Sequence, residues 1–195
     1  MAARPFVTVV SGLPRSGTSL MMRMLESGGI PPVTDRIRAA DEDNPKGYYE
    51  FERVKALDKG DTAWVPEARG RAVKVISALL RHLPPTEEYR VLFMRRRIEE
   101  VLASQKEMLK RRGERTDLAT DAELAELFQR HVRHVEGWAA AQPHAAWLTV
   151  DYNALVADPG PIVERIDRFL GGGLDTAAML GAIDRSLYRQ RAKTP

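Results

Sequence analysis

A short apolar run, Phe6–Val10, leads directly into the glycine-containing segment 11–19, and helix-forming side chains follow at 20–25. A strand of β-branched residues, a glycine-bearing loop and a helix together make the architecture of a phosphate-binding loop. In such a loop the backbone N–H groups and the helix N-terminus converge on an anion. The segment therefore predicts a unit of strand, loop and helix that binds a phosphate or a similar anion.

The loop departs from the nucleotide-binding pattern G-x-x-x-x-G-K-[ST] at one position. Gly12, Gly17 and Ser19 are in register with the pattern, but Thr18 stands where the pattern has lysine. The positive charge lies inside the loop instead, at Arg15. In nucleoside triphosphate enzymes the lysine bridges the β- and γ-phosphates, so its absence argues against a kinase.

The composition is that of an ordinary soluble globular protein. The chain has 195 residues, of which 44% are apolar and 29% charged, and we expect one domain over 1–195. The formal net charge of +3 does not indicate a nucleic-acid partner. The sequence has no cysteine, and no apolar run approaches the ~20 residues that span a bilayer. We therefore expect a cytoplasmic protein with no membrane span.

Three further apolar runs, 72–76, 89–94 and 146–150, have the length and composition of buried strands. Segments with helical periodicity separate and follow them, and one starts at the capping-box sequence Thr120–Glu123. Strands that alternate with helices predict a parallel sheet with helices on both faces. The expected fold class is α/β, a three-layer α/β/α architecture with a parallel sheet of about four or five strands.

Cations lie within or directly after two of the predicted strands. Lys74 lies in one, and Arg95–Arg97 end another, whereas Asp151 after the last strand has no second acid beside it. In open α/β sheets the ligand lies beyond the carboxyl ends of the strands. Several cations and no obvious metal ligand there suit an anionic donor that is handled without Mg²⁺, so no metal is expected.

Two motifs carry a resemblance to a known family. The segment Pro14-Arg15-Ser16-Gly17-Thr18-Ser19-Leu20 resembles the 5′-phosphosulfate loop of the sulfotransferase family, in the form seen in tyrosylprotein and many bacterial sulfotransferases. Arg96 and Ser104 match the arginine at a strand end and the serine eight residues later with which the family holds a 3′-phosphate. The resemblance covers Phe6 to about Met108 well and the remainder loosely.

The resemblance implies a P-loop nucleotide-hydrolase-like fold and 3′-phosphoadenosine 5′-phosphosulfate (PAPS) as the donor of a sulfuryl group. It also implies that Arg15 and Lys74 stabilise the charge that develops during transfer. The C-terminal arginines stand where family members close a basic flap over the donor. The expected donor-binding residues are Pro14, Arg15, Ser16, Gly17, Thr18, Ser19, Arg96, Ser104 and Arg189. Arg97 departs from the family, which usually has an acidic residue at that position.

The general base is the least defined part of the expected site. Cytosolic members have a catalytic histidine two residues after the lysine, but this chain has Ile76 there. A carboxylate in or beside the proline- and glycine-rich segment 28–49 must replace it. The candidates are Asp35, Asp41, Glu42, Asp43 and Glu50, of which Glu42 and Glu50 are favoured as catalytic residues. Asn44–Glu50 resembles the Asn-Pro-x-Gly-aromatic-aromatic-Glu stretch of bacterial members.

The acceptor is expected to be a hydroxyl or amine of a small molecule, a sugar or a lipid, and Trp64 suggests an apolar wall for it. A homodimer that completes the site is a further possibility. His131 lies among apolar residues and is interpreted as a hydrogen-bonded histidine at the edge of the core. Two other functions stay open: a catalytically silent binder of a 3′,5′-bisphosphonucleotide, and a small P-loop metabolite kinase.

Overall fold

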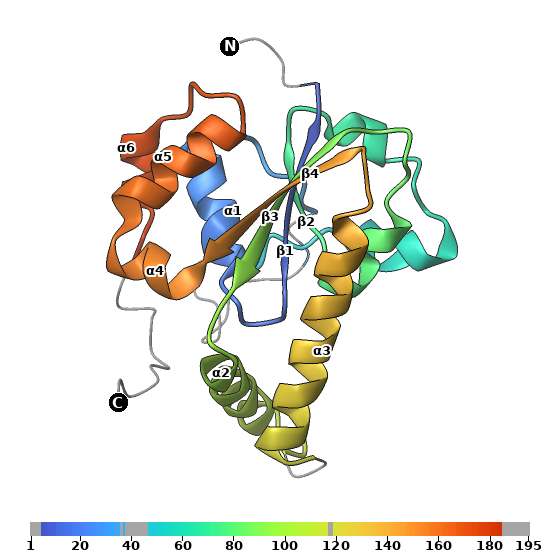
Figure 1. Ribbon diagram of the computed structural model, residues 1–195, viewed down its shortest axis with the longest axis vertical. Helices are drawn as coiled ribbons and strands as arrows, with labels where there is room; N and C mark the ends of the chain where they lie inside the picture. Colours follow the sequence, from blue (N-terminus) through green and yellow to red (C-terminus); the bar gives the residue numbers. More distant parts are fainter. Residues whose placement is uncertain (1–4, 36, 38–46, 117–118, 185–195) are drawn as a thin grey trace.

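Parallel strands form one sheet, in the order β2-β1-β3-β4, in the part of the chain that the structure describes (Figure 1). The computed structural model describes residues 5–35, 37, 47–116 and 119–184. The strands are β1 (Val7–Gly12), β2 (Ala72–Lys74), β3 (Tyr89–Arg95) and β4 (Ala145–Asp151). All four of the predicted apolar runs lie in this sheet, which confirms the predicted α/β class.

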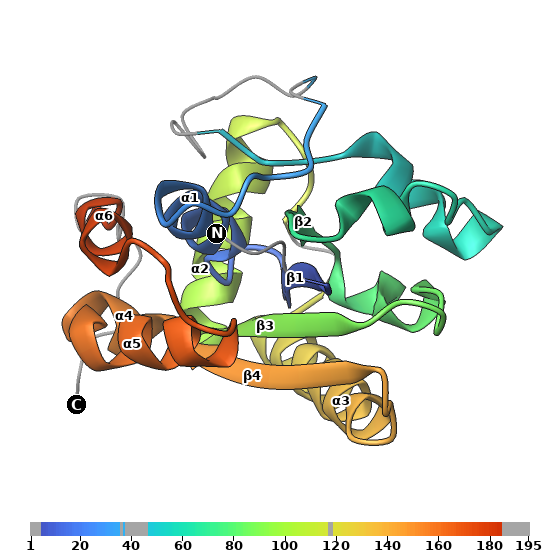
Figure 2. The same cartoon turned by 90° about the horizontal axis from the view of Figure 1, so that it is seen from above.

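Helices cover both faces of the sheet, as the alternating pattern predicts (Figure 2). One face packs against α1 (Thr18–Ser27), α4 (Tyr152–Ala157), α5 (Pro159–Phe169) and α6 (Thr176–Gly181). The other packs against α3 (Asp121–Ala139) and three short 3₁₀ helices, η1 (Glu52–Lys59), η2 (Val65–Ala68) and η3 (Ser77–His82). Helix α2 (Ile98–Arg111) lies beyond the carboxyl ends of the strands (Figure 1).

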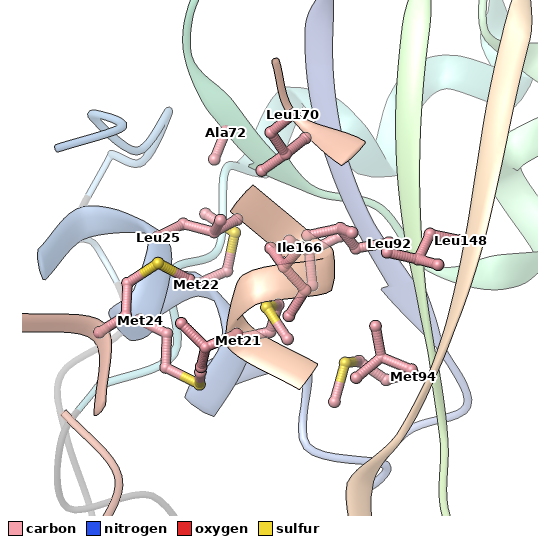
Figure 3. Close-up of a cluster of buried hydrophobic side chains, with 14 of the residues drawn as sticks. Met21, Met22, Met24, Leu25, Ala72, Leu92, Met94, Leu148, Ile166 and Leu170 are labelled. Carbon is pink, nitrogen blue, oxygen red and sulfur yellow. The ribbon is translucent and has the colours of Figure 1, made fainter. Parts of the chain in front are cut away.

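The core on the α1 face is built from apolar side chains with little or no exposure to solvent (Figure 3). Met21, Met22 and Leu25 of α1 and Ile166 of α5 pack toward Leu92 of β3. Helices are amphipathic here because their apolar residues recur at a spacing of three or four. This packing fixes the position of α1, and therefore of the loop that precedes it.

On the opposite face of the sheet, the position of Trp64 shows that the predicted apolar wall for the acceptor is wrong. Trp64 is 3% exposed and belongs to the core between the sheet and the 3₁₀ helices. Its ring packs edge-to-face on Phe51, and its indole N–H donates to the carbonyl of Asp61. An aromatic residue in a polar loop resembles a binding surface in the sequence, but here it anchors the loop to the sheet.

The strand order creates a crevice at the carboxyl ends of β1 and β3. The chain leaves β1 toward β2 on one side and then crosses back to β3 on the other. Ligands of open parallel sheets bind where the order reverses in this way. The loop after β1 and the arginines after β3 border this point, so the topology brings the two predicted motifs together.

No helix among the described residues is both long and apolar enough to cross a membrane. The same part of the chain holds no group of three or more His, Asp or Glu side chains that could bind a metal ion.

Candidate phosphate-binding site

The loop between β1 and α1 is held in a backbone conformation that two glycines make possible. Gly12 and Gly17 have φ values of 150° and 99°. A Cβ atom on Gly12 would lie 2.6 Å from the carbonyl oxygen of Met94, and one on Gly17 would lie 2.3 Å from the Tyr152 ring. Both glycines are therefore required by close approach as well as by backbone geometry.

Two observations show that this loop is suited to an anion. The hydroxyl of Ser16 is buried and has no hydrogen-bond partner among the described residues. Helix α1 begins after Gly17 with no side-chain cap and no acidic residue in its first turn. The first N–H groups of a helix have no partner within the helix and favour negative charge. The loop thus combines a buried hydroxyl with a helix terminus that no side chain caps.

Arg15 connects the loop to the second predicted motif. Its Nε donates to the hydroxyl of Ser104 on α2, at 2.9 Å. Nη1 of Arg96 donates to the carbonyl oxygen of Arg15, at 3.1 Å. The structure therefore brings Arg15, Arg96 and Ser104 into one hydrogen-bonded group, although they lie up to 89 residues apart in the chain.

The side chain of Arg96 is largely buried, unlike that of a solvated arginine at a strand end. Its side chain is 8% exposed, and its Nε donates to Glu100 at 2.9 Å. Its guanidinium also lies over the ring of Tyr152, 4.8 Å from the ring centre. Burial raises the pKa of the Tyr152 phenol, so the phenol stays neutral at physiological pH.

Sequence reasoning missed Glu100 and Asn153, which complete this group. Nδ2 of Asn153 donates to both carboxylate oxygens of Glu100, at 3.1 and 3.0 Å. The spacing of four residues between Arg96 and Glu100 matches that of ion pairs on a helix, although Arg96 lies just before α2. Nothing in the sequence shows that this pair would be buried or that Asn153 would reach it.

Lys74 lies at the carboxyl end of β2, beside the strand that carries the phosphate loop. It is paired in register with Val10 of β1 and is partly buried. Its Nζ donates to the carbonyl oxygen of Tyr48 and lies 5.9 Å from the Tyr48 ring centre. The segment that follows Gly47 is therefore in contact with the strand end at Lys74.

The candidate bases differ in their surroundings. Asp35 accepts backbone N–H groups from Glu52 and Ile37, at 2.6 and 3.1 Å, and the first of these lowers its pKa most. Asp35 is thus a poor base. The carboxylate of Glu50 is 21% exposed and lies 3.9 Å from Nζ of Lys55. Glu42, like Asp41, Asp43 and Arg189, lies outside the described residues.

His131 is a hydrogen-bonded histidine at the edge of the core, as its apolar neighbours suggest. Its Nε2 lies 2.8 Å from the hydroxyl of Ser77, which is 4% exposed. Burial, with a smaller contribution from His134, lowers its pKa below the ordinary 6.5. The contact joins α3 to η3.

A pocket of about 650 Å³ opens beside the loop, between the end of β3 and α3. Its lining includes Leu13, Ser16, Arg96, Val132 and Arg133. The pocket thus extends to Ser16 of the loop, and its volume is within the range of small-molecule sites.

A sequence model of the sulfotransferase family matches residues 49–175. This chain belongs to the sulfotransferase family. The match starts at residue 49, after the loop between β1 and α1.

Solved structures show the same fold at low sequence identity. Mouse sulfotransferase SULT7A1 complexed with PAP is 17% identical over 97% of this chain and 69% of its own, with a TM-score of 0.61. Sulfotransferase STF1 from Mycobacterium tuberculosis H37Rv is 19% identical over 95% and 74%, with a TM-score of 0.59. The sulfotransferase domain of the Synechococcus PCC 7002 olefin synthase is 16% identical over 97% and 81%, with a TM-score of 0.54. No curated protein sequence matches the chain at a significant level.

Substitution of Gly17 by alanine should test the close approach of Tyr152 to the loop. Gly29 is a matched control because its φ of 97° is nearly that of Gly17, while a Cβ there would meet nothing within 4 Å. The backbone strain is then common to both variants, and overpacking is specific to Gly17→Ala. We expect Gly17→Ala to lower the free energy of unfolding by about 1–3 kcal/mol more than Gly29→Ala. Urea denaturation measures this, and equal losses would contradict the contact.

The lowered pKa of His131 predicts a pH dependence of stability. The unfolded chain binds a proton at this site more readily, so stability should be present above about pH 6.5 and be lost as the pH falls below it. His131→Gln keeps an amide that can bond Ser77 and removes the titration. We expect the free energy of unfolding to fall more steeply between about pH 8 and about pH 5.5 in the wild type than in His131→Gln. Parallel curves would show that the imidazole does not titrate differently on folding.

Proposed function

We propose that this protein transfers a sulfuryl group from PAPS to a hydroxyl or amine of a small acceptor molecule. The observation that carries the proposal is the hydrogen bond from Arg15 to Ser104, at 2.9 Å. It joins the loop that would hold the 5′-phosphosulfate to the serine that would hold the 3′-phosphate. A donor with two anionic groups would contact both the loop and Ser104.

The donor side is supported by residues from three places in the chain. The hydroxyl of Ser16 and the first turn of α1 would bind the 5′-phosphosulfate, with Pro14, Gly17, Thr18 and Ser19 shaping the loop. Arg15 would add the positive charge that the missing lysine does not supply. Arg96 and Ser104 would receive the 3′-phosphate, because an arginine fork suits a dianion. The mouse structural neighbour, which is complexed with PAP, agrees with a nucleotide of this kind.

The donor supplies a sulfuryl group joined to a phosphate leaving group, and the transfer is an in-line displacement. Negative charge then builds on the oxygen between sulfur and phosphorus. Lys74 at the end of β2 and Arg15 in the loop are the cations suited to stabilise that charge. Glu50, two residues after the Tyr48 carbonyl that Lys74 contacts, would accept the proton of the acceptor. Glu42 remains the other candidate for this role.

We expect Arg15 to contribute strongly to the affinity for the nucleotide. In Arg15→Ala the loop loses its cation and the partner of Ser104, so the Kd of 3′,5′-bisphosphoadenosine should rise about 10-fold to 100-fold. Isothermal titration calorimetry measures this, with Arg81→Ala, an exposed arginine of η3, as the control that should leave Kd unchanged. Tighter binding of ATP with Mg²⁺ than of the bisphosphate by the wild type would favour the kinase alternative.

Lysine 74 should instead affect the transfer step. Lys74→Ala should lower kcat about 100-fold while the Kd of 3′,5′-bisphosphoadenosine changes less than about threefold, because the lysine acts on charge that develops during transfer. Transfer of radiolabelled sulfate from PAPS to a panel of hydroxyl and amine acceptors measures kcat. Lys59→Ala, at an exposed position of η1, is the control. Bisphosphate binding with no transfer to any acceptor and no donor hydrolysis would favour the silent binder.

A further inference from the structure

We propose that Glu100 is a positioning residue for the donor site, because its buried carboxylate holds Arg96 in place and, through Arg96, the phosphate loop. This inference rests on the proposed function for its role in binding, while the positioning itself rests on the contacts within the protein. Glu100 lies in the first turn of α2 and is 2% exposed. A carboxylate is almost never buried this far unless it is paired.

Donors from two separate strand ends converge on this carboxylate. Nε of Arg96, which follows β3, donates to Oε2 at 2.9 Å. Nδ2 of Asn153, which follows β4, donates to Oε1 at 3.1 Å and to Oε2 at 3.0 Å. Both carboxylate oxygens therefore accept hydrogen bonds, and the carboxylate ties the two strand ends together from the helix side.

The orientation of Asn153 requires a hydrogen-bond acceptor at position 100 on the side that faces its amide nitrogen. Oδ1 of Asn153 accepts the backbone N–H of Arg97, at 3.2 Å, so the amide nitrogen must face Glu100. Arg96 presents only donors as well. An amide at position 100 would turn its own NH₂ group toward one of these donors, and one buried contact would be lost.

Arg96 links the carboxylate of Glu100 to the loop between β1 and α1. Its Nη1 donates to the carbonyl of Arg15, whose φ of 68° is in the left-handed region that non-glycine residues rarely adopt. Arg15 in turn donates to Ser104. Hydrogen bonds therefore run without a break from Asn153 through Glu100, Arg96 and Arg15 to Ser104. Without the carboxylate, the largely buried Arg96 guanidinium loses its ion pair with Glu100, and it should turn toward water.

The test compares three variants with the wild type. Glu100→Gln removes the charge and keeps the shape. Glu99→Gln makes the same change at the adjacent, exposed position of the same helix turn and is the matched control. In the double variant Glu100→Gln/Asn153→Asp the charge moves across the contact, and donors again face acceptors. The double variant also keeps the proposal testable if Glu100→Gln alone does not fold.

The first measurement needs no nucleotide. Hydrogen exchange of the Nε–H groups of Arg96 and Arg15, followed by ¹⁵N NMR, reports whether each guanidinium is held. We expect exchange of both to accelerate about 10-fold or more in Glu100→Gln, and to return toward the wild-type rate in the double variant. An unchanged rate for Arg15 in Glu100→Gln would overturn the proposal, because Glu100 would then stabilise only its own helix.

The second measurement is the ratio of the Kd of adenosine 5′-monophosphate to that of 3′,5′-bisphosphoadenosine. We expect Glu100→Gln to reduce this ratio about 10-fold, since Arg96 and Ser104 would recognise the 3′-phosphate, and Glu99→Gln to leave it unchanged. A variant that melts at a lower temperature with an unchanged ratio would refute the positioning role in binding. If the wild type binds neither nucleotide, the proposed function fails, and the exchange rates alone decide whether Glu100 positions the loop.

Discussion

The pairing of β1 with β3 is the constraint on which the rest of the site depends. Six consecutive residues of β1 are in register with β3, from Val7 opposite Tyr89 to Gly12 opposite Met94. The pairing ends where a Cβ on Gly12 would already meet the Met94 carbonyl. The phosphate loop must therefore turn away beside the first residues after β3, and Arg96 is the residue that meets it there. The crevice at the reversal of strand order is thus filled by charged and polar groups from both strands.

The charge of Arg96 in this crevice is compensated by the carboxylate of Glu100. A buried ion pair contributes little net stability, because removing two charges from water costs about as much as their attraction returns. The pair of Arg96 and Glu100 is therefore better understood as a determinant of geometry than as a source of stability. Tyr152 also constrains the geometry, since its ring contacts Arg96 and leaves no space for a side chain at position 17.

The sequence allows the local elements of this fold to be predicted, because they depend on neighbours in the chain. The strand and loop at 6–19, the capping box at Thr120 and the parallel sheet follow from periodicity and short motifs, and the structure confirms them. The burial of Glu100 and the contact with Asn153 depend on how the ends of β3 and β4 meet, which no local pattern encodes. The prediction that Trp64 lines an acceptor wall is wrong for the same reason, since the same ring can line a pocket or fill a core. The roles of Arg15, Lys74 and Glu50 in binding and transfer stay predictions.

The contacts that Ser104 and Arg96 make within the protein also limit how strongly the site can bind. The hydroxyl of Ser104 already accepts a hydrogen bond from Arg15, and Arg96 already has an anionic partner. A bound 3′-phosphate would replace contacts that the protein makes with itself, so only the difference between the two sets of contacts contributes to affinity. The same contacts keep the side chains near their working positions, which reduces the entropy lost on binding.

Ser16 differs from Arg96 and Ser104, because its buried hydroxyl has no hydrogen-bond partner among the described residues that a ligand would have to replace. Most of the net gain is therefore expected where the loop meets the 5′-phosphosulfate, and the second phosphate would serve to discriminate between nucleotides.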